Sequence, residues 1–137
     1  MRDQAKSLDP LHILVVDDSR DNAETLALML RLEGHDVEAV YSGAEALTAF
    51  AAHAPDVALL DLDMPGLNGL AVARSMRANA HRPLTLIAVT GWGRTEDREA
   101  SRRAGFNLHY TKPVDPERLS AALAACAGRT PERVHPA

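Results

Sequence analysis

The sequence has little of several features that would each indicate a particular class of protein. It contains one cysteine, Cys126, which excludes a disulfide within the chain and a metal site built from several thiolates. The polar N-terminus lacks the apolar core of a signal peptide, and no apolar run approaches the length of a membrane span. We therefore expect a protein of the reducing cytoplasm.

Basic clusters and aromatic residues are also scarce. The 15 lysine and arginine residues stand against 19 aspartate and glutamate residues, for a net charge of -4, and no basic run suggests direct binding to nucleic acid or to a membrane. Aromatic residues make up 4% of the chain, so aliphatic residues and alanine must fill the core. With 137 residues, 46% of them hydrophobic, the chain is long enough for one domain with a buried core.

Short apolar runs alternate with helical patterns along the chain. The runs at 12–16, 36–40, 56–61, 85–89 and 107–111 predict strands, and continuous apolar runs of this length suit strands covered on both faces. Apolar spacing and capping residues predict helices after Ser19 as far as Gly34, at 42–53, at 70–78, from Thr95 and from Pro116. Five strands alternating with five helices predict an α/β fold, a single doubly wound (βα)5 domain with a five-stranded parallel sheet.

The ends of the chain differ from this pattern. Residues 1–10 are polar and end in Asp-Pro, and residues 128–137 contain two prolines. We predict a flexible N-terminal lead at 1–10, the domain at 11–127 and a flexible C-terminal tail at 128–137.

Polar side chains follow four of the predicted strands. The first strand ends in Asp17 and Asp18, the third in Asp61 and the fourth in Thr90, and Lys112 follows the fifth. The carboxyl ends of parallel strands lie at one edge of a sheet, where ligands of such folds bind. The sequence therefore predicts a crevice that combines three carboxylates, a hydroxyl and an ammonium group.

This combination suits the transfer of a phosphoryl group. Carboxylates without His or Cys beside them favour Mg²⁺ over Zn²⁺, and a divalent cation would relieve the repulsion between Asp17 and Asp18. Asp61 is alone at its strand end and is the candidate nucleophile, since an aspartate can form an acyl phosphate. Lys112 and Thr90 can donate to phosphoryl oxygens, and Mg²⁺ with the lysine would neutralise the charge that develops. Each of these motifs alone is most often a helix cap or a turn. The prediction of a phosphoryl-transfer site rests on their joint occurrence at strand ends, in the order Asp-Asp, Asp, Thr, Lys.

These motifs resemble the receiver domain of two-component response regulators, including chemotaxis receivers. The resemblance rests on "VVDDS" (15–19), "LLDLDMPGLNGL" (59–70), "AVTG" (88–91) and "HYTKPV" (109–114), and it spans about residues 11–127. It implies the flavodoxin-like strand order 2-1-3-4-5. "TGWG", "GFNLHYTKPVDPERL" and "SRDNAETL" are similar to receivers of hybrid sensor kinases, which favours a phosphorelay element or diffusible output over a fragment of an ordinary regulator.

The resemblance implies a phosphoacceptor and a metal site. Asp61 would accept a phosphoryl group from a histidine kinase or a histidine phosphotransfer protein. Mg²⁺ would bind Asp17, Asp18, Asp61 and the backbone carbonyl of Asp63. Such a chain is a signalling domain rather than an enzyme, although it catalyses its own phosphorylation and dephosphorylation.

The resemblance also implies a switch. Thr90 would move toward the phosphoryl group, Lys112 would contact its oxygens, and Tyr110 would turn between exposed and buried states. The Lys112–Pro113 peptide bond would be cis, a state that only X-Pro bonds adopt cheaply. The output would be a surface for a downstream protein target, and a homodimer through the 95–111 face is compatible with it.

Two other functions remain open at this stage. "DLD" at 61–63 is similar to the Asp-x-Asp signature of haloacid dehalogenase-type phosphatases, but that family has its motif on the first strand and a Thr or Val where this chain has Pro65. A receiver-shaped module that binds a partner without phosphorylation is the third reading. The side chain of Asp63 either tunes hydrolysis or faces solvent, and Trp92 is either a surface aromatic or part of a docking face.

Overall fold

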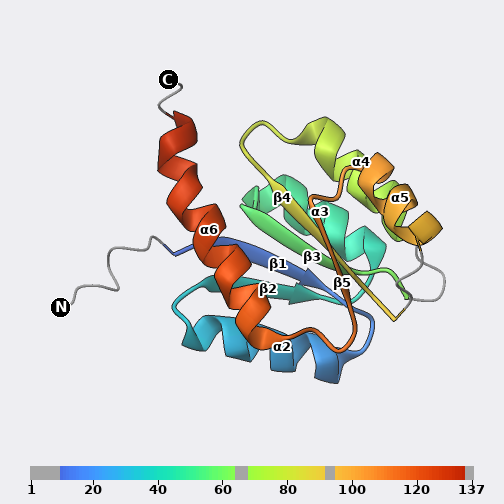
Figure 1. Cartoon of the computed structure of the whole chain (residues 1–137), viewed down its shortest axis with the longest axis horizontal. Coiled ribbons are helices and arrows are strands. Elements are labelled where there is room, and N and C mark those ends of the chain that lie inside the picture. Colours follow the sequence, from blue (N-terminus) through green and yellow to red (C-terminus); the bar gives the residue numbers. More distant parts are fainter. Residues whose placement is uncertain (1–9, 64–67, 92–94, 135–137) are drawn as a thin grey trace.

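The computed structural model describes residues 10–63, 68–91 and 95–134. The strands are β1 (His12–Val16), β2 (Asp36–Val40), β3 (Val57–Asp61), β4 (Thr85–Thr90) and β5 (Leu108–Thr111). The helices are α2 (Arg20–Leu32), α3 (Gly43–His53), α4 (Gly69–Asn79), α5 (Thr95–Ala104) and α6 (Pro116–Val134). The strands form one parallel sheet in the order β2-β1-β3-β4-β5 (Figure 1). The predicted fold class and strand order are confirmed.

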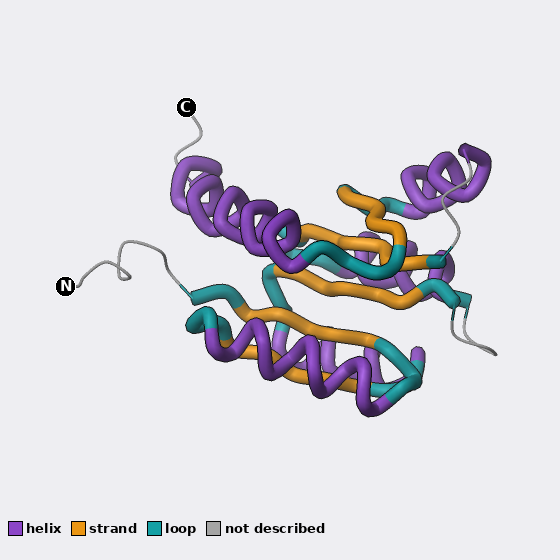
Figure 2. Tube along the Cα trace, turned by 60° about the horizontal axis from the view of Figure 1, so that its bottom comes forward, coloured by secondary structure: helices purple, strands orange, loops and turns teal. Residues whose placement is uncertain are grey.

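Helices lie on both sides of the sheet (Figure 2). The core consists of two apolar layers, one on each face of the sheet. Successive residues of β1 point to opposite faces: Ile13 and Val15 pack toward α2 and α6, whereas Leu14 and Val16 pack toward α3 and α4. Every residue of β3 is buried. The continuous apolar runs in the sequence predict a sheet covered on both faces, and the two apolar layers confirm this prediction.

The helix boundaries have local causes in the sequence. Ser19 accepts a hydrogen bond from the Asn22 amide at the start of α2, and Ser42 accepts one from the Glu45 amide at the start of α3. Gly34 follows α2 with a φ of 99°, a backbone conformation that glycine adopts most readily. Ser19 and Gly34 thus confirm the predicted start and end of the first helix, α2.

The last helix extends further than the sequence predicts. The sequence pattern predicts a tail from residue 128, because proline usually ends or kinks a helix, but the backbone of α6 is helical as far as Val134. Pro131 has no N–H to donate, but every other added residue can contribute a backbone hydrogen bond at little extra cost once a helix has formed, which favours this continuation. The domain limits at 11 and 127 stay a prediction. Within the described segments, no helix has both the length and the apolar character needed to cross a membrane.

Candidate functional site

The sheet register brings the predicted site residues to one edge. Asp61 is the last residue of β3 and is paired with Val89 of β4, so Thr90 lies one residue further along the same edge. Asp17 and Asp18 follow directly after β1, the other neighbour of β3. Lys112 follows β5, and its amide donates a 2.8 Å hydrogen bond to the Thr90 carbonyl. The four strands that carry site residues are adjacent, and the predicted convergence is present.

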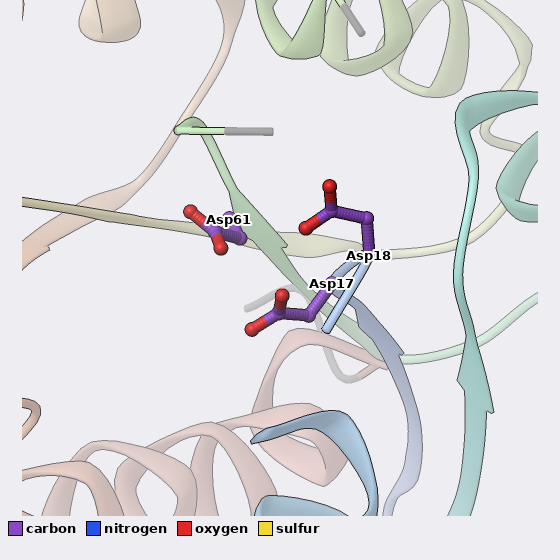
Figure 3. Close-up of side chains that lie close together, drawn as sticks. All are labelled: Asp17, Asp18 and Asp61. Carbon is purple, nitrogen blue, oxygen red and sulfur yellow. The ribbon is translucent and has the colours of Figure 1, made fainter. Parts of the chain in front are cut away.

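Three carboxylates form a cluster at this edge (Figure 3). Oxygens of Asp17, Asp18 and Asp61 lie within 4.8 Å of one another; the Asp61 side chain is buried and Asp18 is exposed. Burial raises the pKa of Asp17, and the charge of Asp61 raises it further, while a hydrogen bond from the Ser19 amide opposes the shift. The cluster therefore carries unfavourable negative charge that a cation would relieve.

Lys112 provides a positive charge beside this cluster. Its Nζ lies 2.9 Å from Oδ2 of Asp61 and 3.3 Å from Oδ2 of Asp63. Burial lowers the pKa of Lys112, but its contacts with the two carboxylates outweigh this effect and raise the pKa overall. The Lys112–Pro113 peptide bond, which the resemblance implies is cis, is cis in the structure. The ammonium group is thus charged and lies against the candidate nucleophile.

Asp63 is an exposed residue whose carboxylate points toward the end of β4. Its Oδ1 accepts a 2.8 Å hydrogen bond from the Thr90 hydroxyl, and its Oδ2 accepts one of 2.8 Å from the Gly91 amide. Its own amide donates a 2.8 Å hydrogen bond to Oδ1 of Asp61. Burial would raise the pKa of Asp63, but hydrogen bonds from Thr90 and Gly91, together with Lys112, hold it below its usual value. The sequence does not decide whether this side chain tunes hydrolysis or faces solvent. In the structure it contacts Thr90, Gly91 and Lys112, and an effect on hydrolysis stays a prediction.

Two aromatic residues were predicted to take part in the switch or the output surface. Tyr110 lies in the edge strand β5, half-buried against the apolar layer that includes α2 and α6. The Arg118 guanidinium carbon lies 5.5 Å from the centre of the Tyr110 ring, a cation–π distance. Trp92 lies outside the described residues. Rotation of Tyr110 stays a prediction.

The donors present fit Mg²⁺. The cluster offers only carboxylate oxygens, the ligands that this hard cation prefers, and neither His nor Cys belongs to it. The Asp63 carboxylate is directed to Thr90 and Gly91, so its side chain is not part of the cluster. Its backbone carbonyl as a further ligand stays a prediction.

Sequence comparisons place this chain beside proteins of one family. The profile described as "Response regulator receiver domain" matches residues 13–124. The DNA-binding response regulator MtrA of Mycobacterium tuberculosis is 39% identical over 113 residues, which are 82% of this chain and 49% of that protein. An uncharacterized 14.6 kDa protein of Leptolyngbya boryana is 37% identical over 115 residues, covering 83% of this chain and 88% of that protein. The chain thus spans about half the length of curated relatives such as MtrA.

Solved structures share the same arrangement of strands and helices. A CheY-like response regulator receiver domain protein from Methanospirillum hungatei superposes with a TM-score of 0.82 at 25% identity, covering 91% of this chain and 99% of that one. A CheY-like receiver domain from Methylobacillus flagellatus superposes with a TM-score of 0.75 at 27% identity, covering 86% of this chain and 99% of that one. The similarity therefore extends over almost the whole fold.

Proposed function

This chain belongs to the response regulator receiver domains of two-component signalling, and from that premise we propose that Asp61 is its phosphoacceptor. The observation that carries the proposal is the buried Asp61 carboxylate at the end of β3, 2.9 Å from the Lys112 ammonium and within the acidic cluster. Asp61 is the one member of the cluster that contacts both the lysine and the Asp63 amide. It is therefore the carboxylate best oriented to receive a phosphoryl group.

The proposed reaction transfers a phosphoryl group from a phosphohistidine of a histidine kinase or a histidine phosphotransfer protein. An Asp61 oxygen attacks the phosphorus of a phosphohistidine whose other ring nitrogen is protonated. The P–N bond breaks, its electron pair stays on the ring nitrogen, neutral imidazole leaves, and Asp61 becomes an acyl phosphate. Lys112 contacts phosphoryl oxygens during transfer and stabilises their charge. Mg²⁺, bound by Asp17, Asp18 and Asp61 with the Asp63 carbonyl, would supply further charge neutralisation.

The output is proposed to follow from new contacts to the phosphoryl oxygens. Thr90 moves toward them, and Tyr110 turns into the space this creates, which changes the face made by α5 and β5. A downstream protein, or a second copy of the chain through residues 95–111, would bind this altered face. Phosphorylation acts here as a local charge change that biases a two-state element. The domain would later hydrolyse its own acyl phosphate, which resets the switch.

Direct nucleic-acid binding is not part of this proposal. The name of MtrA includes DNA binding, but the matched region covers 49% of that protein. This chain has a net charge of -4, and its sequence contains no long run of Lys and Arg of the kind that contacts nucleic-acid phosphates. We therefore propose a protein partner. The relation to hybrid sensor kinases, and the choice between a phosphorelay element and a diffusible output, remain expectations from the sequence.

The proposal is tested by the intact mass of the protein after incubation with acetyl phosphate. Wild type is expected to gain a single base-labile phosphoryl group, and only when Mg²⁺ is present. Asp61→Asn should gain none, whereas Asp21→Asn, which removes an exposed acid in the first turn of α2, should behave as wild type. An Asp61→Asn protein phosphorylated to the wild-type extent would contradict the assignment. Continuous release of phosphate from a phosphomonoester would instead favour the phosphatase reading.

A further inference from the structure

The Asp63 carboxylate contacts three hydrogen-bond donors of the site in the protein without a phosphoryl group. Its two oxygens accept from the Thr90 hydroxyl and the Gly91 amide at 2.8 Å each, and Oδ2 lies 3.3 Å from the Lys112 ammonium. The donors come from the end of β4 and from the residue after β5, so the carboxylate links two neighbouring strand ends. They converge on one anion, which is the arrangement a phosphoryl group would also require.

We propose that Asp63 is an internal competitor of the phosphoryl group, holding Thr90, Gly91 and Lys112 until the phosphoryl oxygens displace its carboxylate. This inference rests on the proposed role of Asp61 and adds to it a positioning residue. Asp63 does not react; it acts through the donors that it holds.

The backbone ties this competitor directly to the phosphoacceptor. The Asp63 amide donates to Oδ1 of Asp61 at 2.8 Å, and Lys112 contacts both carboxylates. A dianion formed on Asp61 would therefore develop beside the negative charge of Asp63, and like charges at this range repel one another. The ammonium of Lys112 and the hydroxyl of Thr90 would have to leave the Asp63 carboxylate in order to contact the phosphoryl group on Asp61.

The residue after Thr90 gives independent support. Gly91 has no side chain, and a Cβ built at this position would lie 3.3 Å from Oδ2 of Asp63, closer than ordinary van der Waals contact. Glycine therefore leaves room for the carboxylate to reach the Gly91 amide. The hydrogen bond between the Gly91 amide and the Asp63 carboxylate thus depends on both residues, Asp63 after β3 and Gly91 after β4.

Removal of the Asp63 charge distinguishes competition from support. If the carboxylate competes, its loss frees the donors and removes repulsion, so a phosphoryl analogue binds more tightly. If instead it merely orders the donors for the phosphoryl group, its loss weakens binding. The two readings predict opposite signs.

The test is a calorimetric titration with beryllofluoride at saturating Mg²⁺. We expect Asp63→Asn and Asp63→Ala to bind beryllofluoride about tenfold more tightly than wild type, since a hydrogen bond to a charged group is worth about one decade or more in affinity. Asp21→Asn should bind as wild type, because it removes the same charge without touching the three donors. In a Thr90→Val background, the gain from Asp63→Asn should shrink, since one of the contested donors is gone.

A spectroscopic readout checks the geometry apart from any change in folding. The amide proton of Gly91 should resonate downfield in wild type, as expected for a donor to a carboxylate, and move upfield in Asp63→Ala. Equal or weaker beryllofluoride binding by both Asp63 variants, with normal binding by wild type, would overturn the competition and leave the proposed function intact. Absence of both beryllofluoride binding and phosphorylation in wild type would contradict the proposed function itself.

Discussion

At the scale of single residues, the acidic cluster that can bind a cation also destabilises the folded protein when no cation is bound. Burial and the charge of Asp61 raise the pKa of Asp17, so the ionised carboxylate is less favourable in the folded protein than in the unfolded chain. Ionised Asp17 therefore lowers the free energy of unfolding at pH values above its raised pKa. This loss is relieved when Asp17 takes up a proton or when a cation binds. The chain keeps the acid although it weakens the fold, as expected for a ligand.

The Asp17→Asn variant tests this trade. Without Mg²⁺, it should unfold at a higher denaturant concentration than wild type, with a gain of roughly 1 kcal/mol, because a charge is removed while the amide oxygen can still accept from Ser19. Mg²⁺ should then stabilise wild type but not the variant, since only wild type retains the full carboxylate set.

The matched control is Asp21→Asn. It should change stability little and keep the response to Mg²⁺. An Asp17→Asn protein that is less stable than wild type without Mg²⁺ would contradict a destabilising charge at Asp17. An Asp17→Asn protein that Mg²⁺ stabilises as much as wild type would contradict the role of Asp17 as a metal ligand.

A second prediction concerns pH and His35. The Nδ1 atom of His35 accepts a 3.2 Å hydrogen bond from the Leu11 amide, and burial lowers its pKa from 6.5, opposed in part by Glu33. As pH falls below about 6.5, the unfolded chain binds a proton at this residue that the folded protein does not bind. The free energy of unfolding should therefore decrease in this range, and His35→Gln should flatten the decrease.

The comparison variant for His35 is His81→Gln, which changes an exposed histidine. Chemical denaturation of the three proteins between pH 7.5 and 5.5 is the measurement. A wild-type decrease that His35→Gln leaves intact would exclude His35 as its source.

At the scale of elements, one arginine joins parts of the fold that lie far apart in the sequence. From α4, the Arg77 guanidinium donates to the Leu84 carbonyl before β4 and to the Gly105 carbonyl after α5, at 2.7 and 2.6 Å. It also donates to Oδ1 of Asn107, which in turn accepts from the Leu86 amide. Burial lowers the pKa of Arg77. The side chain thus satisfies acceptors between α4, the end of α5 and the amino ends of β4 and β5, at the edge of the sheet opposite the site.

Arg77→Ala should destabilise the protein by about 2–3 kcal/mol, since it leaves two backbone carbonyls and an amide oxygen without this donor. Arg77→Lys should recover only part of the loss, because an ammonium group cannot reproduce the planar fork of the guanidinium. Arg74→Ala removes an exposed arginine of the same helix and should cost at most about 0.5 kcal/mol. Equal losses in Arg77→Ala and Arg74→Ala, measured by denaturant unfolding, would contradict this role.

At the scale of the whole molecule, stability and chemistry occupy different places. Two apolar layers cover the faces of the sheet, while the carboxyl ends of four strands present polar side chains at one edge. The sequence predicts both parts for physical reasons. Buried parallel strands require continuous apolar runs, and parallel topology brings Asp61, Thr90 and Lys112 together without any knowledge of side-chain positions.

Other features could not be predicted from one-dimensional patterns. The orientation of Asp63 depends on three donors that are 27, 28 and 49 residues away in sequence, as the numbering of Thr90, Gly91 and Lys112 shows. The contacts of Arg77 likewise depend on how α4 packs against later elements. The end of α6 depends on a balance between helix propagation and a proline that no periodicity resolves. Hydrophobic periodicity specifies layers and edges, whereas specific polar contacts require the folded chain.

The most direct measurement of the central claim is to locate the phosphoryl group on the chain. Wild type is incubated with acetyl phosphate and Mg²⁺, the acyl phosphate is reduced with borohydride, and the peptides are sequenced by tandem mass spectrometry. Reduction converts a phosphorylated aspartate to homoserine, with loss of phosphate. The account predicts homoserine at position 61 and at no other aspartate, and none when acetyl phosphate or Mg²⁺ is omitted. Homoserine at position 17, 18 or 63 in place of 61 would contradict it.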